Sequence, residues 1–116
     1  MGYTVIPTDE FERLLTKLAR KYPKVVDVVE EYFLELECIK GNVPGDVIQG
    51  TGSHLVIKTR HANPDANRGK QGGFRIIITV VVTENEIYPL SIYSKNVTEK
   101  ITKEEILSII NRNVLH

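Results

Sequence analysis

The stretch NRGKQGGFRIIITVVV, Asn67 to Val82, runs from a basic, glycine-rich segment straight into the most apolar part of the chain. Its second half is rich in β-branched residues, which predicts a strand over 74–82. One cation, Arg75, stands inside this run, two residues after a pair of glycines. The chain has no net charge, so the gathering of cations beside its most apolar strand needs an explanation.

Two more strands are predicted on either side of this one, HLVIKTR at 54–60 and EIYPLSIYSK at 86–95. Only Glu84-Asn85 separates the last two strands, so we expect them to be antiparallel neighbours. Pro89 has no N–H for a ladder, which indicates an edge or a bulge at that point. The segment YTVI near the N-terminus is a candidate for a short first strand.

Three helices are predicted around the strands. Thr8 is expected to cap the first helix, whose apolar residues recur at helical spacing until the Lys-Tyr-Pro at 21–23. A second helix with one apolar stripe over 25–36 follows directly, so the two should form an antiparallel hairpin. The turn-rich segment 40–53 then leads to the strands. TKEE at 102–105 is a capping box that opens a short C-terminal helix.

These elements indicate one α+β domain over 1–116, with an N-terminal helical hairpin packed on a twisted antiparallel sheet of three to four strands and a short C-terminal helix. No apolar run approaches the roughly 20 residues that cross a bilayer. The first residues lack the pattern of a secretory signal, so a cytoplasmic protein without a membrane partner is expected. Cys38 is the single cysteine, which excludes an intramolecular disulfide, and we expect it to be buried.

The charges are unevenly distributed although Lys+Arg and Asp+Glu both number 15. The segment 9–37 is rich in acids, and the segment 54–75 is rich in cations. Side chains alternate between the two faces of a strand. If the apolar sets pack on the helices, the free face of the sheet gathers five residues from three strands: Lys58, Arg60, Arg75, Tyr93 and Lys95.

Such a face suits phosphate contacts and the stacking of unpaired bases. The preceding loop adds Arg68 and Lys70, and its glycines would allow a ligand to approach the backbone closely. His54 and His61 flank the first of the three strands and are candidate RNA-binding groups. The alternative is an ordinary solvated sheet face, with charges that prevent aggregation and histidines that merely lie on the surface. No metal site is predicted.

The order of five motifs resembles the RelE/HigB-type toxins of bacterial toxin–antitoxin modules. The resemblance spans nearly the whole chain, and its most specific parts are GKQGGFR and IYSKN. The five motifs are, in chain order, T-x-x-F…LARKYP (8–23), G-x-x-I…G…K-x-R (45–60), GKQGGFRII (69–77), IYPLSIYSKN (87–96) and TKEEI (102–106).

This resemblance implies a toxin that inhibits translation as a ribosome-dependent mRNA endonuclease. The ribose 2′-hydroxyl would attack the adjacent phosphorus without a metal or other cofactor, leaving a 2′,3′-cyclic phosphate and a 5′-hydroxyl. The implied partners are mRNA in the ribosomal A site and a cognate antitoxin, with the toxin a monomer alone or a heteromer with the antitoxin.

Carried over to this chain, the resemblance assigns catalysis to the five residues of the free face and also matches Lys70. With Arg68, His54 and His61, which the residue pattern alone singles out, Lys70 is expected to bind RNA. Arg60 and Arg75 would clamp phosphates, Lys58 would assist proton transfer, and Tyr93 would stack on a base, with Lys95 beside them. Ile78, Thr79 and Asn96 stand where active relatives carry a tyrosine and an arginine. A ParE-like gyrase inhibitor and a catalytically inactive, antitoxin-binding homologue therefore stay open as alternatives.

Overall fold

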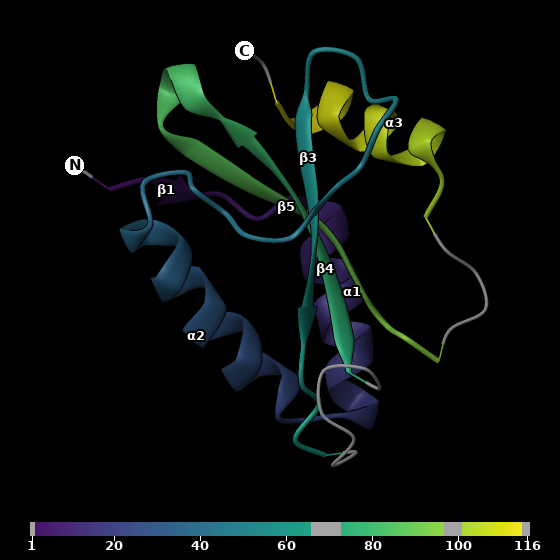
Figure 1. The fold of residues 1–116 in the computed structure, drawn as a ribbon. Helices are drawn as coiled ribbons and strands as arrows, with labels where there is room; N and C mark the ends of the chain where they lie inside the picture. The colour runs from purple at the N-terminus through teal and green to yellow at the C-terminus, as the bar shows by residue number, and fades with distance from the viewer. Residues whose placement is uncertain (1, 66–72, 97–100, 115–116) are drawn as a thin grey trace.

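The computed structural model describes residues 2–65, 73–96 and 101–114 (Figure 1). The three strands and three helices expected from the sequence all form, and the bounds of the strands differ from the predicted ones by no more than one residue. Each helix in these described ranges is too short or too polar to cross a membrane. The elements are β1 Thr4–Val5, α1 Asp9–Lys21, α2 Val25–Cys38, β2 Asp46–Val47, β3 Leu55–His61, β4 Phe74–Val81, the 3-10 turn η2 Val82–Glu84, β5 Glu86–Ser94 and α3 Lys103–Asn113.

The sheet has five strands in the order β1-β5-β4-β3-β2, so the expectation of three to four strands is wrong. It is also mixed, because β1 runs parallel to β5 while the other pairs are antiparallel. The unexpected strand is β2, which lies in the segment predicted as turns. Gly45 permits this pairing, because a Cβ at that position would lie 2.7 Å from the Lys58 carbonyl oxygen.

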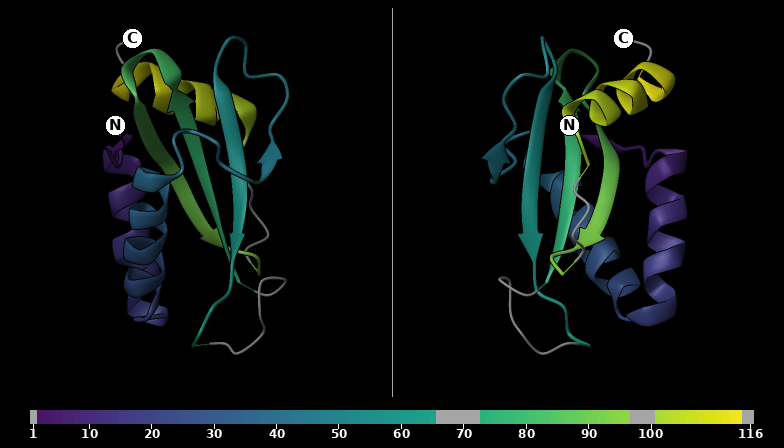
Figure 2. Two further views of the ribbon diagram at one scale, coloured as in Figure 1. Left: turned by 60° about the vertical axis from the view of Figure 1, so that its left-hand side comes forward. Right: turned by 90° about the vertical axis from the view of Figure 1, so that its right-hand side faces the viewer.

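The helices α1 and α2 lie side by side along the sheet, and α3 lies across one end of it (Figure 2). The face toward α1 and α2 holds the larger core, in which the predicted alternation of β4 is confirmed. Its strand residues come from β3, β4 and β5 and are all buried: Ile57, Phe74, Ile76, Ile78, Val80, Ile87 and Ile92.

The opposite face of the sheet is only partly free. Its end nearer the β4–β5 turn packs on α3 and forms a second core, which includes Val56, Ile77 and Leu90 from the sheet. The helix contributes Ile106 and Ile110 to this core. The expectation of an entirely open face is therefore corrected, because the apolar residues that alternate with the first set on β4 also need a cover. Among the described residues no helix covers the remaining end of this face, which we call the open end.

A bulge in β5 divides this strand between the two cores. The register with β4 shifts between Ile77 and Ile78, so that Leu90 has no cross-strand partner. Tyr88 and Leu90 accordingly face α3, whereas Ile92 faces α1 and α2. Strict alternation along the predicted strand 86–95 would put these three residues on one face, and the bulge prevents it. Pro89, beside the bulge, is expected from the sequence to lie at an edge or a bulge, and the bulge is confirmed.

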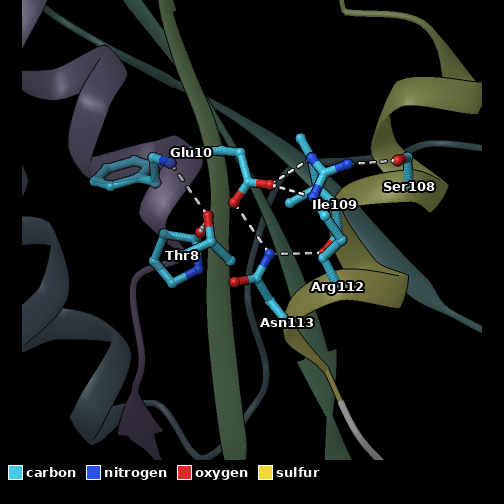
Figure 3. Close-up of polar contacts among 8 residues, drawn as sticks. Thr8, Glu10, Ser108, Ile109, Arg112 and Asn113 are labelled. Atoms are coloured by element: carbon cyan, nitrogen blue, oxygen red, sulfur yellow. Dashed lines mark hydrogen bonds and ion pairs between the residues drawn. The ribbon is translucent and has the colours of Figure 1, made fainter.

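The N-terminus of α1 is tied to this bulge by Thr8, the predicted N-cap. Its hydroxyl accepts from the Phe11 amide at 3.2 Å and donates to the Pro89 carbonyl at 2.9 Å (Figure 3). The Thr8 amide donates to the same carbonyl at 3.1 Å. One threonine therefore satisfies a helix end and the outer side of β5 at Pro89, so Pro89 does not lie at an open edge.

A second polar contact joins α1 to α3 (Figure 3). The Glu10 carboxylate accepts from Arg112 Nε at 2.8 Å and from Asn113 Nδ2 at 3.0 Å, and Arg112 Nη2 forms an ion pair with it. Arg112 Nη1 also donates to the Ser108 hydroxyl at 2.8 Å. The end of the C-terminal helix is therefore fixed to the start of the first helix.

Cys38 is exposed, contrary to expectation. The buried stripe of α2 ends at Leu36, which is fully buried. Since each helical residue turns by about 100°, the second residue after Leu36 points away from the core.

Candidate nucleic-acid interface

Three of the predicted site residues form a row across the open end of the sheet. Arg60 on β3 lies directly opposite Arg75 on β4, and Arg75 lies directly opposite Tyr93 on β5. Side chains opposed in this way have Cβ atoms about 5 Å apart and share one face. The bulge and the pairing of β4 with both neighbours place this row on the face away from α1 and α2. We call Arg60, Arg75 and Tyr93 the cationic row.

Arg75 is buried at the centre of the row, with 6% of its surface exposed. Its Nη1 donates to the Phe74 carbonyl at 3.2 Å. Burial lowers the pKa of the guanidinium, and the nearby charge of Arg60 lowers it further. Arginine nevertheless stays protonated in proteins, so a fixed positive charge lies just below the surface. The side chain is less accessible than a phosphate clamp on an open face would be.

Tyr93 and Arg60 flank this buried charge. Burial raises the pKa of the half-buried Tyr93, while the positive charges of Arg75 and Arg60 oppose the rise. The phenol therefore stays protonated at neutral pH and can donate a hydrogen bond. The Arg60 side chain is 47% exposed, which makes it the more accessible of the two arginines. The row thus offers one exposed guanidinium, one buried guanidinium and one phenol.

Lys58 and Lys95 extend the positive charge beyond the row. Lys58 lies two residues before Arg60 on the same face of β3 and is half-buried, whereas Lys95 is exposed just after β5. The Lys95 amide donates to the Gly73 carbonyl at 3.0 Å, which fixes the chain as it leaves the sheet. The five residues predicted to form the site therefore come from β3, β4 and β5 and from the turn that follows β5.

Asp46 is the site residue that sequence reasoning missed. It pairs with Lys58 across the β2–β3 ladder, and its Oδ2 lies 2.5 Å from Arg60 Nη1. The signal that could have found it is the triplet DVI at 46–48, whose short apolar segment can pair with β3. Because glycines and a proline surround this triplet, the sequence predicts turns there instead of a strand.

Gly73 holds the two arginine-bearing strands together. A Cβ at this position would lie 1.8 Å from the His61 carbonyl oxygen, a distance that no side chain can tolerate. The sequence suggested that the glycines before β4 allow a ligand to approach. For Gly73 the close neighbour is instead the backbone of β3.

The two histidines do not join the row. His54 lies at the other end of β3, about 20 Å from Arg60 along an extended strand. His61 points to the opposite face, where its ring packs on Tyr32 with centroids 4.3 Å apart. Its Nε2 lies 2.7 Å from the Thr59 hydroxyl, a hydrogen bond between two groups of the same strand. His61 lines a groove of about 530 Å³ between α2 and the edge of β3.

Two further candidates, Arg68 and Lys70, fall outside the described residues. Within the described ranges no group of three or more His, Cys, Asp or Glu side chains is arranged to hold a metal ion.

A second groove runs along the outer side of β5, between α1 and α3, with a volume of about 770 Å³. Strand β1 pairs with β5 only at Glu86 and Ile87, so the described residues place no strand beside Ser91–Ser94 on that side. The floor of the groove is apolar and includes Leu14, Leu18 and Ile109. Its rim carries both signs of charge, with more cations than acids: Arg13, Lys17, Lys21, Arg112, Glu10 and Glu105.

No protein-family model matches the chain. Among solved structures it is similar to the E. coli toxin RelE, determined as a double mutant in the free state, with a TM-score of 0.55 over 99% of this chain and 100% of that one. This chain has a RelE-like fold. The two sequences are 15% identical, so the similarity concerns the arrangement of helices and strands. The RelE-like fold and the row on its sheet are separate observations.

Proposed function

We propose that this protein is the toxin of a toxin–antitoxin module and cleaves mRNA on the ribosome. The observation that carries the proposal is the cationic row, in which two guanidinium groups and a phenol stand side by side on the open end of a RelE-like sheet. The two guanidinium groups oppose one another directly across β3 and β4, so the row concentrates positive charge that phosphate groups would match.

The proposed reaction uses the row for charge stabilisation. The 2′-hydroxyl of a ribose loses its proton to a base, and its oxygen attacks the adjacent phosphorus. The 2′-O–P bond forms as the P–O5′ bond breaks, and the leaving O5′ takes up a proton, so the products are a 2′,3′-cyclic phosphate and a 5′-hydroxyl. Arg60 and Arg75 balance the negative charge that builds on the phosphoryl oxygens. Lys58 takes part in proton transfer, and Tyr93 stacks on a base or donates to the phosphate. Protein side chains supply every role in this scheme.

A partner fits the groove between α1 and α3. An antitoxin segment with apolar side chains would cover Leu14 and Leu18, and a strand of that segment could pair with the outer side of β5 at Ser91–Ser94. The cations on the rim favour an acidic segment. We expect the protein and its antitoxin to elute together as a heteromer.

Primer-extension mapping in a ribosome-programmed reaction tests the nuclease activity. The wild-type protein should create new 5′-hydroxyl ends within the mRNA, and Arg75→Ala should lower the cleavage rate about 100- to 1,000-fold, as loss of an electrostatic stabiliser does. Arg20→Ala, exposed on α1 on the other side of the sheet from the row, is the matched control and should cleave at the wild-type rate. Full activity of Arg75→Ala would remove the row from the mechanism.

The alternatives give different results after induction in cells. Growth arrest with new 5′-hydroxyl ends supports the nuclease. Arrest with DNA-damage signalling and intact RNA supports the gyrase inhibitor. The third candidate is an inactive homologue that keeps only the antitoxin interface, to which Ile78, Thr79 and Asn96 point. That protein would cause no arrest.

A further inference from the structure

The ion pair between Asp46 and Arg60 lies inside the proposed RNA site. Asp46 stands on the edge strand β2 and points to the same face as Lys58, its cross-strand partner. Its carboxylate reaches diagonally to Arg60, with 2.5 Å between Oδ2 and Nη1. Arg60 therefore already binds one anionic oxygen, Oδ2 of Asp46, at the border of the cationic row. The proposed function places a phosphate oxygen at this position.

Arg60 is the guanidinium of the row that a ligand can reach. Its side chain is 47% exposed and that of Asp46 is 53% exposed, whereas Arg75 is buried. An ion pair this exposed contributes little to folding, typically below about 1 kcal/mol. A phosphate accepts two parallel hydrogen bonds from arginine as a carboxylate does, with more negative charge. A phosphate can therefore replace Asp46 at small cost.

We propose that Asp46 is an internal phosphate mimic that occupies Arg60 in the free protein and is displaced when RNA binds. This inference rests on the proposed function and adds a regulatory contact to the same site. The carboxylate lowers the affinity of the row for isolated phosphates. A ligand that also contacts the neighbouring Lys58 and Tyr93 gains enough binding free energy to offset the loss of the Asp46–Arg60 ion pair. The ion pair therefore favours an RNA strand bound along the face over an isolated phosphate. Asp46 is thus a positioning residue that acts through Arg60.

Binding to ribosomes programmed with a short mRNA tests the inference. Cys38 is exposed on α2, behind the sheet, and as the single cysteine of the chain it can carry a fluorescent label away from the row. The variant is Asp46→Asn. Its control is Asp27→Asn on the exposed side of α2, which changes the net charge equally. The dissociation constant is measured by fluorescence anisotropy between about 50 and 200 mM KCl.

Asp46→Asn should bind about 2- to 5-fold more tightly than the control at the lowest salt, the gain expected when an exposed competing ion pair is lost. Salt weakens the Asp46–Arg60 ion pair that RNA must displace in the wild type, so the advantage of the variant should shrink about 2- to 3-fold by about 200 mM. Asp46→Glu, which keeps the carboxylate, should bind as the wild type does.

A double-mutant cycle with Arg60→Ala shows whether Asp46 acts through that arginine. In the Arg60→Ala background, Asp46→Asn should have no effect beyond that of the Asp27→Asn control. Equal or weaker binding by Asp46→Asn in the wild-type background would overturn the inference. Arg75→Ala separates the two levels of the argument. If it weakens binding while Asp46→Asn matches its control, only the inference fails, whereas unchanged binding by Arg75→Ala counts against the proposed function itself.

Discussion

Arg60 and Arg75 lie directly opposite one another on adjacent antiparallel strands, with one guanidinium exposed and the other buried. Like charges in this position destabilise a sheet. Burial lowers the pKa of Arg75, and the charge of Arg60 lowers it further. Asp46 forms an ion pair with Arg60, and Tyr93 acts in the opposite direction on Arg75 by raising its pKa. Placing the two arginines opposite one another lowers the stability of the fold and concentrates positive charge. Such a loss of stability is common at functional sites.

The two arginines should respond differently to lysine. Arg75→Lys keeps the charge but loses the planar group that donates to the Phe74 carbonyl inside the sheet, so cleavage should fall at least about 10-fold. Arg60→Lys leaves an exposed cation in place and should cost less than about 3-fold. Cleavage rates in the ribosome-programmed reaction compare them. Equal losses would show that burial does not distinguish the two roles.

Thr8→Ala should lower the free energy of unfolding by about 1–2 kcal/mol, because it removes both the helix cap and the hydrogen bond to the Pro89 carbonyl. The control is Thr16→Ala on the exposed face of α1, where the hydroxyl bonds only to the Glu12 carbonyl one turn earlier. That change should be nearly neutral. Urea denaturation measures both, and similar losses would contradict the role given to Thr8.

The Glu10 contact to α3 should make stability depend on pH. Burial alone would raise the pKa of Glu10, but hydrogen bonds from Arg112 and Asn113 outweigh it, and the pKa lies below its ordinary value of 4.5. The folded state therefore favours the ionised form, and this contribution is present above pH 4.5 and lost as the pH falls through the lowered pKa.

Glu10→Gln should accordingly be less stable than the wild type by about 0.5–1 kcal/mol at pH 7, and the difference should vanish in acid. Glu12→Gln, an exposed change in the same turn of α1, should show neither effect. Chemical denaturation at a series of pH values measures both variants. A difference that persists unchanged at low pH would mean that the charge of Glu10 is irrelevant.

Gly73→Ala should destabilise the protein by about 2–3 kcal/mol, because its methyl group would collide with the backbone of β3 and push the two arginine-bearing strands apart. Gly52→Ala offers a comparison, since it has open space around it but a φ of +65°. Its cost should be about 1 kcal/mol from the backbone conformation alone. A loss at Gly73 no larger than at Gly52 would remove the steric argument.

Cys38 should react with a thiol reagent at the rate of an unfolded cysteine, because it is exposed at the end of α2. One protein thiol per chain should react with the reagent under native conditions. A rate that rises only after denaturant is added would show that the thiol is covered in solution.

Periodicity predicted the long strands and the helices because each carries an apolar repeat long enough to show. Alternation along β4 placed Arg75 opposite the larger core, and that position is confirmed. The capping box before α3 and the N-cap of α1 are also confirmed, since both depend on neighbouring residues only.

The misses arise where distant segments decide the structure. Strand β2 has two residues, and only its pairing with β3 makes Asp46 part of the site. The depth at which Arg75 lies depends on what packs above the sheet, which alternation cannot reveal. Nearness to an apolar stripe predicts a buried Cys38, but its angle around the helix leaves it exposed.

The extra residue in the bulge, Leu90, also determines on which face of the sheet Tyr93 lies. In strict alternation Tyr93 would take the opposite face from Tyr88 and point between the helices of the larger core. Because the bulge inserts one step, both tyrosines face the same way, and the second one reaches Arg75. A chain shortened by that single residue could still build a sheet, but its aromatic ring would be turned inward and the row would end at two arginines.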